Sequence, residues 1–313
     1  MVPRHWGHAV GPSSEDLVPA LAESIARLDV GSRIPTIREL ARTLHSTVAS
    51  THVALNRLEE LGAVQTDRRG RNGVHLANKD AVRLWFAASR GRGPFLVALP
   101  LPTTLLQQGT ATALRALFSR ANLELNLAFI PGSRTRAMVL RLHQADAVVM
   151  SSLAAEVVAT GEETVAITLP PKTMTNCTQV YTRLRSSGAA RIRIGIDTSV
   201  ADLARLTELE FRSMSLDLVD ARAIQFGTLL HDGQIDAVIA REEDALLWPS
   251  GGWYGRDVSA HVRSQVGDSD TRAAVVTRSA DYVATELVRR VIDGDELARV
   301  QQEVLAGRMA PSF

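Results

Sequence analysis

The stretch from Ile34 to Gly62 reads IPTIRELARTLHSTVASTHVALNRLEELG, and its pattern predicts two short helices joined by a tight turn. Thr36 and Glu39 have the spacing of a capping box, in which the hydroxyl accepts a free backbone N–H of the first turn and the carboxylate accepts the N–H of the cap residue. His45 interrupts the apolar spacing of the first helix, and Gly62 is a typical residue to end the second. This pattern is typical of a helix-turn-helix, whose second helix enters the major groove of DNA.

The sequence after Gly62 predicts a hairpin with a basic tip. Ala63–Thr66 and Val74–Ala77 have the composition of two strands, and residues 67–73 between them contain Gly, Asn and three arginines. A basic loop beside the second helix is typical of a wing that lies on DNA phosphates or enters a groove. Ordinary helical hairpins share the helix-turn-helix spacing, but the cap, the glycine and the basic wing together favour DNA binding over a purely structural hairpin.

We expect two groups of side chains to contact DNA. The second helix should face base edges with Ser50 and His52, supported by neighbours on the same helix, while the arginines should contact phosphates or the minor groove. The predicted DNA-binding residues are Thr36, Arg38, Thr47, Ala49, Ser50, His52, Asn56, Arg68, Arg69 and Arg71.

Residues 16–77 resemble the winged helix-turn-helix of GntR-type bacterial regulators. Ile34–Ala41 (IPTIRELA) is similar to their LPSxRELA, and Leu55–Gly62 (LNRLEELG) is similar to their LxxLExxG helix end. Many members have Ser-Arg at the start of the second helix, whereas this chain has Thr47-Val48. The DNA-contacting role of that arginine is therefore not transferred to Val48.

Length and composition fit a protein of two domains. The chain has 313 residues, 45% of them hydrophobic, and no apolar run approaches 18 residues. The first 30 residues contain four acidic side chains and no continuous apolar segment, so we expect no export signal, no membrane span and a cytoplasmic location. The single Cys177 cannot form an internal disulfide, and we expect it to be a packed residue rather than a nucleophile.

Charge is unevenly distributed along the chain. Residues 1–92 carry 13 Lys and Arg against 9 Asp and Glu, and the remainder carries 22 against 25. A basic N-terminal part on a mildly acidic remainder fits a DNA-binding domain followed by a domain that does not contact DNA.

From Phe95 onward, short apolar runs alternate with amphipathic helices, which implies crossovers onto a largely parallel sheet buried on both faces. Pro170-Pro171 is the predicted hinge, Pro249–Tyr254 is expected to be a loop, and Arg272–Thr277 is expected to be a strand that returns to the first lobe. The predicted organisation is a flexible leader (1–14), a winged helix-turn-helix domain (15–79), a linker helix and boundary (80–93) and a two-lobed α/β domain (94–313), with lobe 1 at about 94–169 plus 270–313 and lobe 2 at about 172–268.

Two segments of the second domain are alike. Leu142–Met150 (LHQADAVVM) and Leu230–Ala240 (LHDGQIDAVIA) each end a helix with Leu-His and begin a strand with Asp-Ala-Val. Paired α/β lobes joined by a stiff hinge would hold a ligand in the cleft between them. A helix followed by a turn and such a strand is also common in unrelated parallel sheets, so convergence stays open.

The second domain resembles the effector domain of YhfZ-type regulators, a branch of GntR-like proteins. The residues that carry this resemblance are Ala98–Pro102, Pro131–Arg134, Ala190–Asp197, Leu206–Glu210 and Gly233–Ala237. The resemblance implies an α/β multidomain fold, with an N-terminal winged helix-turn-helix and a two-lobed periplasmic-binding-protein-like domain of type 2. It also implies a ligand-responsive transcription factor and leaves the ligand open.

Ligands of open α/β sheets bind beyond the carboxyl ends of strands, near helix N-termini. The residues predicted to bind the effector on this ground are Thr103, Thr104, Ser133, Arg134, Ser151, Ser152, Asp197, Ser199 and Arg241. Hydroxyls, free amides and arginines suit a carboxylate or a phosphate. Each hydroxyl could equally be a plain helix cap, and each arginine a solvated surface charge.

The sequence lacks the common catalytic motifs, and we expect no catalytic residue, no metal site and no cofactor. The resulting hypothesis is a cytoplasmic regulator that binds a double-stranded DNA operator as a homodimer and responds to a small, anionic metabolite. The alternative is a two-lobed solute-binding or transferase-type enzyme whose basic head serves dimerisation or docking.

Overall fold

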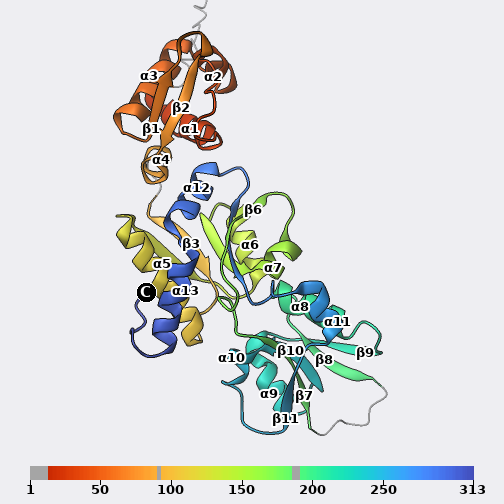
Figure 1. The fold of residues 1–313 in the computed structure, drawn as a ribbon. Coiled ribbons are helices and arrows are strands. Elements are labelled where there is room, and N and C mark those ends of the chain that lie inside the picture. Colours follow the sequence, from red (N-terminus) through yellow and green to blue (C-terminus); the bar gives the residue numbers. More distant parts are fainter. Residues whose placement is uncertain (1–12, 90–92, 185–190) are drawn as a thin grey trace, which may run out of the picture. The chain divides into compact units, whose positions relative to one another are not determined.

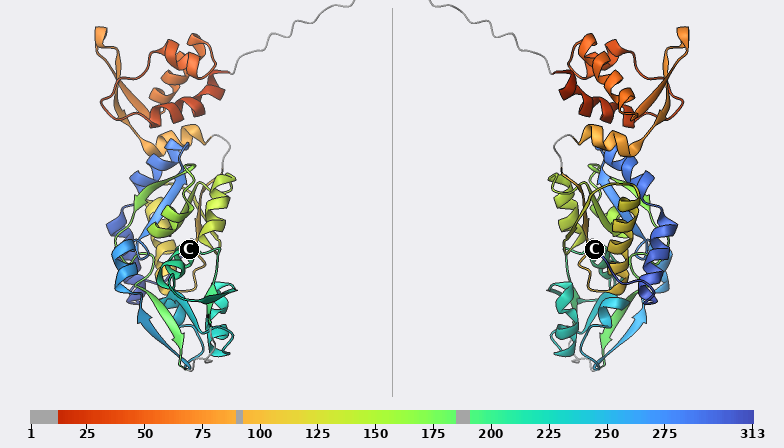
Figure 2. Two further views of the ribbon diagram at one scale, coloured as in Figure 1. Left: turned by 90° about the vertical axis from the view of Figure 1, so that its right-hand side faces the viewer. Right: turned by 90° about the vertical axis from the view of Figure 1, so that its left-hand side faces the viewer.

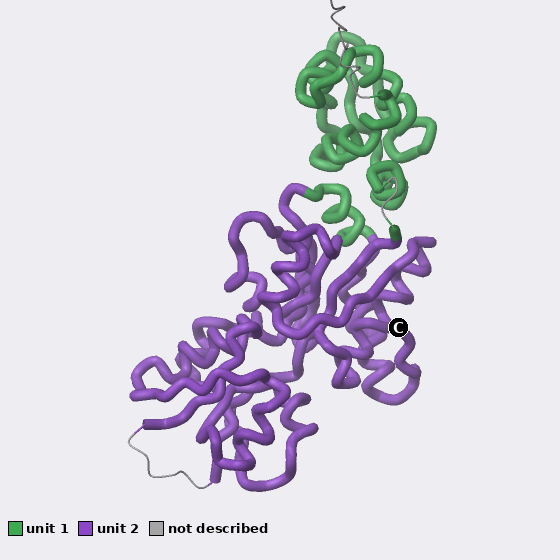
Figure 3. Tube along the Cα trace, turned by 180° about the vertical axis from the view of Figure 1, so that it is seen from behind, with its two compact units in different colours: residues 1–93, 281–290 green, residues 94–280, 291–313 purple. Residues whose placement is uncertain are grey.

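The computed structural model describes residues 13–89, 93–184 and 191–313 (Figure 1). The chain forms two compact units (Figure 3): the head comprises Met1–Gly93 and Asp281–Arg290, and the body comprises Pro94–Ala280 and Val291–Phe313. Nearly all of the predicted leader (1–14) lies outside the described residues, as do residues 90–92 of the predicted boundary.

The head is a winged helix-turn-helix, as the sequence predicted. Its elements are α1 (Ser14–Ala26), α2 (Ile37–Thr43), α3 (Val48–Glu60), β1 (Val64–Arg68), η1 (Gly70–Asn72), β2 (Val74–Lys79), α4 (Ala81–Ala88) and α12 (Tyr282–Val291). The apolar faces of α1, α3 and β2 meet in a core that includes the fully buried Leu21, Ile25, Leu58 and Leu76. This core fixes the orientation of α3, the helix on which the predicted base contacts lie.

The wing is the antiparallel hairpin β1–β2, which extends from the helical part of the head (Figure 2). The pairing begins at Val64↔Lys79, and a register shift between Gln65 and Thr66 interrupts it. At the tip, Gly70 and Gly73 have φ values of 56° and 81°. Glycine adopts this left-handed region without the steric penalty that a Cβ atom imposes, so the tight turn depends on it.

The helix α12 belongs to the head by its contacts, whereas we expected all of residues 270–313 to complete lobe 1. The Glu23 carboxylate of α1 accepts the backbone N–H groups of Tyr282 (3.0 Å) and Val283 (3.3 Å). Lys79 of β2 forms an ion pair with Glu286 at 3.0 Å. These contacts cap the helix N-terminus, whose free N–H groups favour a negative charge.

The body consists of two α/β lobes. Lobe 1 contains β3 (Phe95–Leu99), α5 (Leu105–Arg120), β4 (Leu125–Phe129), α6 (Ser133–Arg141), β5 (Ala147–Ser151), α7 (Ser152–Val158), β6 (Glu163–Thr168), β12 (Ala273–Arg278) and α13 (Gly294–Leu305). Lobe 2 contains β7 (Thr178–Arg183), β8 (Ile192–Ile196), α8 (Ala201–Glu210), β9 (Leu216–Asp220), η2 (Ala223–Gln225), α9 (Phe226–His231), β10 (Ala237–Arg241), α10 (Glu242–Ala245), β11 (Trp253–Asp257) and α11 (Ala260–Val266).

The two lobes have the same strand order. In the described residues, lobe 1 has the order β4-β3-β5-β12-β6 and lobe 2 has the order β9-β8-β10-β7-β11. In each of these sheets, one strand is antiparallel to its neighbours, β12 in lobe 1 and β7 in lobe 2. In sequence, β7 is the first strand after the chain leaves lobe 1, and β12 is the first strand after it leaves lobe 2. The sheets are therefore mixed where we expected them to be largely parallel, and the predicted two-lobed fold is confirmed.

The repeated Asp-Ala-Val segments have the same structural role in the two lobes. The Asp146 carboxylate accepts the backbone N–H of Leu96 at 2.9 Å, and the Asp236 carboxylate accepts that of Arg193 at 3.0 Å. In turn, the backbone N–H of each aspartate donates to the carbonyl of the same partner. Each aspartate thus fixes the register between the central strand of its lobe and the neighbouring strand.

Part of lobe 2 differs from the expected elements. The strand β11 (Trp253–Asp257) pairs with β7, although its first residues were expected to be a loop. Trp253 lies in an aromatic cluster with Tyr181 and Trp248, and the ring centroids are 5.0 to 5.6 Å apart. Burial of these large rings stabilises an edge strand whose sequence has little alternation.

Among the described residues, no helix is long and apolar enough to cross a membrane.

Glu23→Gln should make the head less sensitive to pH. Burial, together with the nearby negative charge of Asp281, raises the pKa of Glu23 to about 7. The folded head therefore holds this proton more tightly than the unfolded chain, and the resulting stability is present below pH 4.5 and is lost as the pH rises through about 7. The variant is always neutral, so its melting temperature relative to the wild type should rise by several degrees between pH 5 and pH 8.

Differential scanning calorimetry at these two pH values provides the measurement. Glu156→Gln, which changes an exposed carboxylate of α7, is the matched control. Equal melting-temperature differences at pH 5 and pH 8 for Glu23→Gln would contradict the assignment.

Candidate nucleic-acid interface and effector site

The N-terminus of α3 is fixed by its cap. The Thr47 hydroxyl accepts the backbone N–H of Ser50 at 3.0 Å. On the buried face, the Thr51 hydroxyl donates to the Thr47 carbonyl at 2.8 Å, and Leu58 is fully buried. The cap and this packed face together leave the opposite side of α3 to solvent, which is the arrangement that a recognition helix needs.

The residues predicted to face base edges lie on or beside this open side. Thr47, Ala49 and His52 are exposed, whereas Ser50 and Asn56 are half-buried. The Ser50 hydroxyl accepts from Thr47 at 2.9 Å, and the Asn56 amide lies 3.4 Å from Nδ1 of His52. These contacts are local and solvent-accessible, so a base edge can replace them.

The first helix of the motif is capped as predicted. The Thr36 hydroxyl accepts the backbone N–H of Glu39 at 3.3 Å, and the Glu39 carboxylate accepts the backbone N–H of Thr36 at 2.7 Å. The backbone N–H and hydroxyl of Thr36 lower the pKa of Glu39. Arg38 follows on the exposed side of α2. Thr36 is thus engaged in the cap, whereas Arg38 projects into solvent.

The three wing arginines differ in their surroundings. Arg68, Arg69 and Arg71 are all exposed. Arg69 forms an ion pair with Asp67 at 2.7 Å. Within the described residues, no carboxylate lies at ion-pair distance from Arg68 or Arg71. These two side chains therefore carry unneutralised positive charge at the tip of the hairpin.

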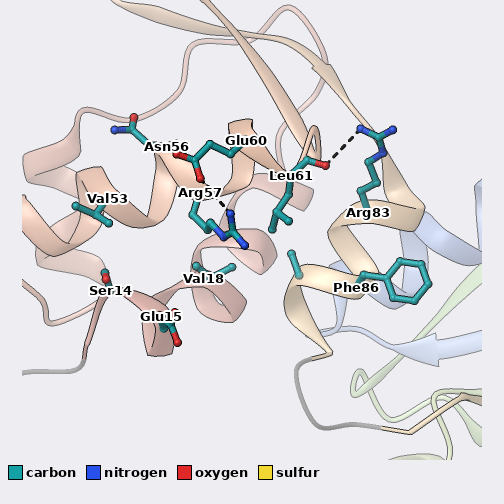
Figure 4. Close-up of a pocket in the computed structure, with 11 residues that line it drawn as sticks. Ser14, Glu15, Val18, Val53, Asn56, Arg57, Glu60, Leu61, Arg83 and Phe86 are labelled. Atoms are coloured by element: carbon teal, nitrogen blue, oxygen red, sulfur yellow. Dashed lines mark hydrogen bonds and ion pairs between the residues drawn. The ribbon is translucent and has the colours of Figure 1, made fainter.

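The head also has an open groove of about 530 Å³ between α1, α3 and α4 (Figure 4). It is lined by Ser14, Glu15, Val18, Val53, Asn56, Arg57, Glu60, Leu61, Arg83, Phe86 and Ala87. Three of its apolar side chains are strongly exposed, namely Val53 at 51%, Leu61 at 39% and Phe86 at 55%. Exposed apolar side chains gathered in one concave surface are typical of interaction sites.

In the body, the predicted effector residues form three groups. The first group caps α5: the Thr104 hydroxyl accepts the backbone N–H of Gln107 at 3.3 Å, and the Thr103 hydroxyl donates to the Gln107 side chain at 3.0 Å. The two threonines therefore have the plain capping role that the sequence left open.

The second group joins the N-terminus of α6 to lobe 2. The buried Ser133 hydroxyl accepts the backbone N–H of Ala201 at 2.9 Å, and Arg134 donates from its backbone N–H to Ser199 O and from Nε to Thr198 O, both at 3.0 Å. A Cβ atom at Gly132 would lie 2.7 Å from the Ser199 hydroxyl oxygen. Lobe 1 thus approaches lobe 2 so closely here that only glycine fits.

Asp197 and Ser199 belong to the same loop of lobe 2. The Asp197 carboxylate accepts the Ser199 hydroxyl at 2.6 Å and the backbone N–H of Ala223 at 2.8 Å. It also lies 3.6 Å from the exposed Arg222 guanidinium. Asp197 therefore organises the loop internally.

The third group surrounds Asp202, a buried carboxylate of α8 that the sequence analysis did not select. Ser151 of lobe 1 donates from its hydroxyl to Oδ2 of Asp202 at 2.7 Å, and Arg241 donates from Nη2 to the same oxygen at 2.8 Å. Ser151 ends β5 and Arg241 ends β10, which are equivalent strands of the two lobes. We call Ser133, Arg134, Ser151, Asp202 and Arg241, with the 198–201 loop, the inter-lobe seam.

The seam contains polar atoms without partners. Among the described residues, Oδ1 of Asp202, Nε of Arg241 and the hydroxyl of Ser152 are buried and form no hydrogen bond. Burial opposes ionisation of Asp202, but Arg241 and the Ser151 hydrogen bond outweigh it and hold the pKa of Asp202 below its usual value. An ionised, partly unsatisfied carboxylate in such surroundings is energetically unfavourable, so the seam is not fully satisfied as it stands.

Arg136 is a second buried cation that sequence reasoning missed. Its Nε donates to Val149 O at 2.9 Å and its Nη1 to Ile130 O at 2.7 Å. Burial, reinforced by the positive charge of Arg241, lowers the pKa of Arg136 to about 9. It lies on the face of α6 that also carries the buried Ala137 and Leu140, so helical spacing signals this face, but a positive charge there favours an exposed position.

The single cysteine of the body is a poor nucleophile. Burial, with the negative charge of Glu242 nearby, raises the pKa of Cys177 to about 12, so the thiolate that would act as a nucleophile is disfavoured. In the part of the chain that the structure describes, no group of three His, Cys, Asp or Glu side chains could hold a metal ion. The chemistry available at the seam is therefore ionic and hydrogen-bonding recognition.

Two family models match this chain. The helix-turn-helix domain matches residues 29–76, and the YhfZ C-terminal domain matches residues 80–313. The first match covers the motif of the head and most of its wing. The expectation of a helix-turn-helix joined to a YhfZ-type effector domain is thereby confirmed.

Relatives support the same assignment. YhfZ of Escherichia coli strain K12 is 31% identical over 302 residues, which are 95% of this chain and 96% of that protein. The crystal structure of YhfZ from Shigella flexneri matches with 29% identity and a TM-score of 0.59, over 70% of this chain and 93% of that chain. The chain belongs to the YhfZ family, because the YhfZ C-terminal domain matches the whole body and the relative from Escherichia coli matches nearly the full length.

Proposed function

We propose that this protein is a transcriptional regulator that binds an operator through its head and responds to a small anionic metabolite through its body. The observation that carries the proposal is the head itself, in which the open side of α3 is accompanied by an exposed basic wing. A helix-turn-helix in a two-domain chain points to a DNA-binding regulator.

In this proposal, α3 enters the major groove and the wing follows the backbone. His52 and Ala49 face base edges, and Ser50 and Asn56 turn toward them when their local contacts are replaced. Arg38 on α2 and the arginines of the wing contact phosphates. Because Arg69 is neutralised by Asp67, Arg68 and Arg71 supply most of the phosphate attraction.

A homodimer would bind two half-sites, and the groove of the head is the surface proposed for its interface. A two-fold interface uses the same patch on both copies, so the patch must complement itself. The groove has apolar side chains at Val53, Leu61 and Phe86, and its charged side chains are Glu60, which pairs with Arg57, and Arg83, which donates to the Leu61 carbonyl (Figure 4). Rotated onto a second copy, this surface can pair acidic with basic and apolar with apolar groups.

The effector would act on the inter-lobe seam. Most of the predicted effector residues lie there and bind one another or the opposite lobe. A ligand that replaces some of these contacts has different affinities for the joined and the separated lobes, and it therefore shifts the equilibrium between them.

The primary test is a gel-shift assay of the full chain on genomic fragments from upstream of its own gene, with and without a metabolite extract. We expect one or more fragments to shift and the extract to change the midpoint. If no fragment shifts at protein concentrations of about 0.1 µM, which is below the non-specific dissociation constants of about 10⁻⁴–10⁻⁶ M at physiological salt, the regulator proposal fails.

Arg68→Ala combined with Arg71→Ala should weaken DNA binding regardless of sequence. Each lost phosphate contact lowers the slope of log K against log salt by about one unit, so the double variant should lose about two. Arg69→Ala should lose less because its side chain already has a carboxylate partner. Fluorescence anisotropy at salt concentrations between about 50 and 200 mM measures the slope. Over this range a protein with several phosphate contacts loses about 10³–10⁵ in affinity.

The matched control is the pair Arg205→Ala and Arg212→Ala, two exposed arginines of lobe 2. This control should leave the slope unchanged. A double wing variant with the wild-type slope would exclude the wing from phosphate contact.

Phe86→Asp should separate the proposed dimer. It introduces a charge at an apolar part of the interface, and an unpaired buried charge there should raise the dissociation constant of the dimer at least about ten-fold. Sedimentation velocity of the full chain measures this constant, and affinity for a two-half-site operator should fall with it.

Ile224→Asp, at a side chain of lobe 2 that is 78% exposed, is the control and should leave the dimer intact. Phe86→Leu should preserve it as well. A Phe86→Asp protein that dimerises as the wild type does would show that the interface lies elsewhere.

A further inference from the structure

The environment of Asp202 is that of a carboxylate in an anion site. Its Oδ2 receives two donors, the Ser151 hydroxyl and Arg241 Nη2, from the ends of equivalent strands in the two lobes. Asp202 is 2% exposed and the Arg241 side chain 12%. A buried arginine beside a hydroxyl donor is a typical element for binding an oxyanion.

The hydrogen bonding between Asp202 and Arg241 is incomplete. Arginine and a carboxylate commonly form two parallel hydrogen bonds, but here one is formed, and both Nε of Arg241 and Oδ1 of Asp202 lack partners in the described structure. An unsatisfied buried polar group destabilises the state that contains it, because its hydrogen bonds to water are lost without replacement. Asp202 therefore binds Arg241 less well than a freely oriented oxyanion would.

A second guanidinium lies close by without a carboxylate of its own. Arg136 is 3% exposed, and its Nε and Nη1 donate to the carbonyl oxygens of Val149 and Ile130. Within the described residues, no carboxylate lies at ion-pair distance from it. A buried cation held by neutral dipoles is stabilised further when an anion approaches.

Other acidic side chains near Arg241 are differently engaged. The Glu243 carboxylate accepts the Thr175 hydroxyl and the backbone N–H of Asn176. Burial raises the pKa of Asp244, which favours its neutral form. Asp202 is thus the carboxylate that a competing anion has to replace.

We propose that an oxyanion binds Arg241, with Arg136 nearby, by displacing the Asp202 carboxylate, which otherwise occupies the position of the ligand's own anionic group. This inference rests on the proposed function and specifies its effector site. Loss of Asp202 from Arg241 also removes its hydrogen bond to Ser151, so binding of the anion separates a contact between the two lobes. The shared ligand chemistry is a carboxylate or phosphate group.

The test uses the full chain and two probes, inorganic phosphate and acetate, titrated at constant ionic strength against chloride. Asp202→Asn keeps the shape of the side chain and removes its charge. The variant should bind one of the probes at least ten-fold more tightly than the wild type in isothermal titration calorimetry. Asp202→Asn combined with Arg241→Met should lose this gain. The probe that responds identifies phosphate or carboxylate as the preferred group.

Asp232→Asn is the matched control, because it removes an exposed carboxylate from the same lobe and should bind the probes as the wild type does. If Asp202→Asn does not fold, Asp202→Ser removes the same carboxylate and should give a gain of the same sign. A folded Asp202→Asn or Asp202→Ser protein with wild-type affinity for both probes would overturn the inference. So would an Asp202→Asn gain that survives in the double variant.

Operator binding by the same variants separates this inference from the proposed function. Tighter probe binding by Asp202→Asn without any effect of probe on DNA affinity would support the anion site and contradict effector control. The opposite outcome is also distinguishable. If the DNA affinity of the wild type responds to metabolites but the Asp202 variants bind the probes as the wild type does, effector control is supported and the anion site is contradicted.

Discussion

The contact of one carboxylate oxygen of Asp202 with both lobes is the interaction on which the organisation of the body depends. Ser151 and Arg241 end equivalent strands, so the pseudo-symmetry of the lobes brings a hydroxyl and a guanidinium to the same oxygen atom. Oδ2 is thereby satisfied by groups that lie about ninety residues apart, while Oδ1 is not. A charge buried in this way is stable only while both lobes contribute to it. The joined state of the lobes and the ionised state of Asp202 are therefore linked.

Much of the fold follows from local rules that a sequence states directly. The capping box of Thr36 and Glu39 requires only a spacing of three residues, and both of its hydrogen bonds are present. The basic tip of the wing follows from glycines that permit its turn. The paired Asp-Ala-Val segments predicted paired lobes, and Asp146 and Asp236 have equivalent roles. The same spacing rules selected helix N-termini as effector residues. They selected Ser133, Ser151 and Arg241, which lie at the seam, and Thr104, which caps α5.

The features that the sequence did not predict depend on distant partners. Arg136 shares the buried face of α6 with Ala137 and Leu140, and its charge favours an exposed position, yet the carbonyl groups of Ile130 and Val149 hold it inside. Asp202 follows Ala201 near the start of a helix, where an acidic residue is ordinary. Its burial depends on Ser151 from the other lobe. The strand β7 pairs with β10 some sixty residues later, and no local alternation marks such a pairing. Long-range contacts decide these cases.

Chain connectivity gives the seam a route to the head that does not depend on side-chain contacts between the two units. The backbone N–H groups of Ser152 and Leu153, at the start of α7, donate to the carbonyls of Arg272 and Ser269, immediately before β12. From β12 the chain leaves the body at residue 280, forms α12 within the head, and returns at residue 291. In the head, α12 is fastened to α1 through Glu23, and α1 packs against α3. Ser152, the residue after Ser151, is thus hydrogen-bonded to the residue before β12, and the chain after β12 forms α12 of the head. The segment from β12 to α12 is therefore a covalent connection between the body and the head, and its chain continuity constrains how a change in one unit can reach the other.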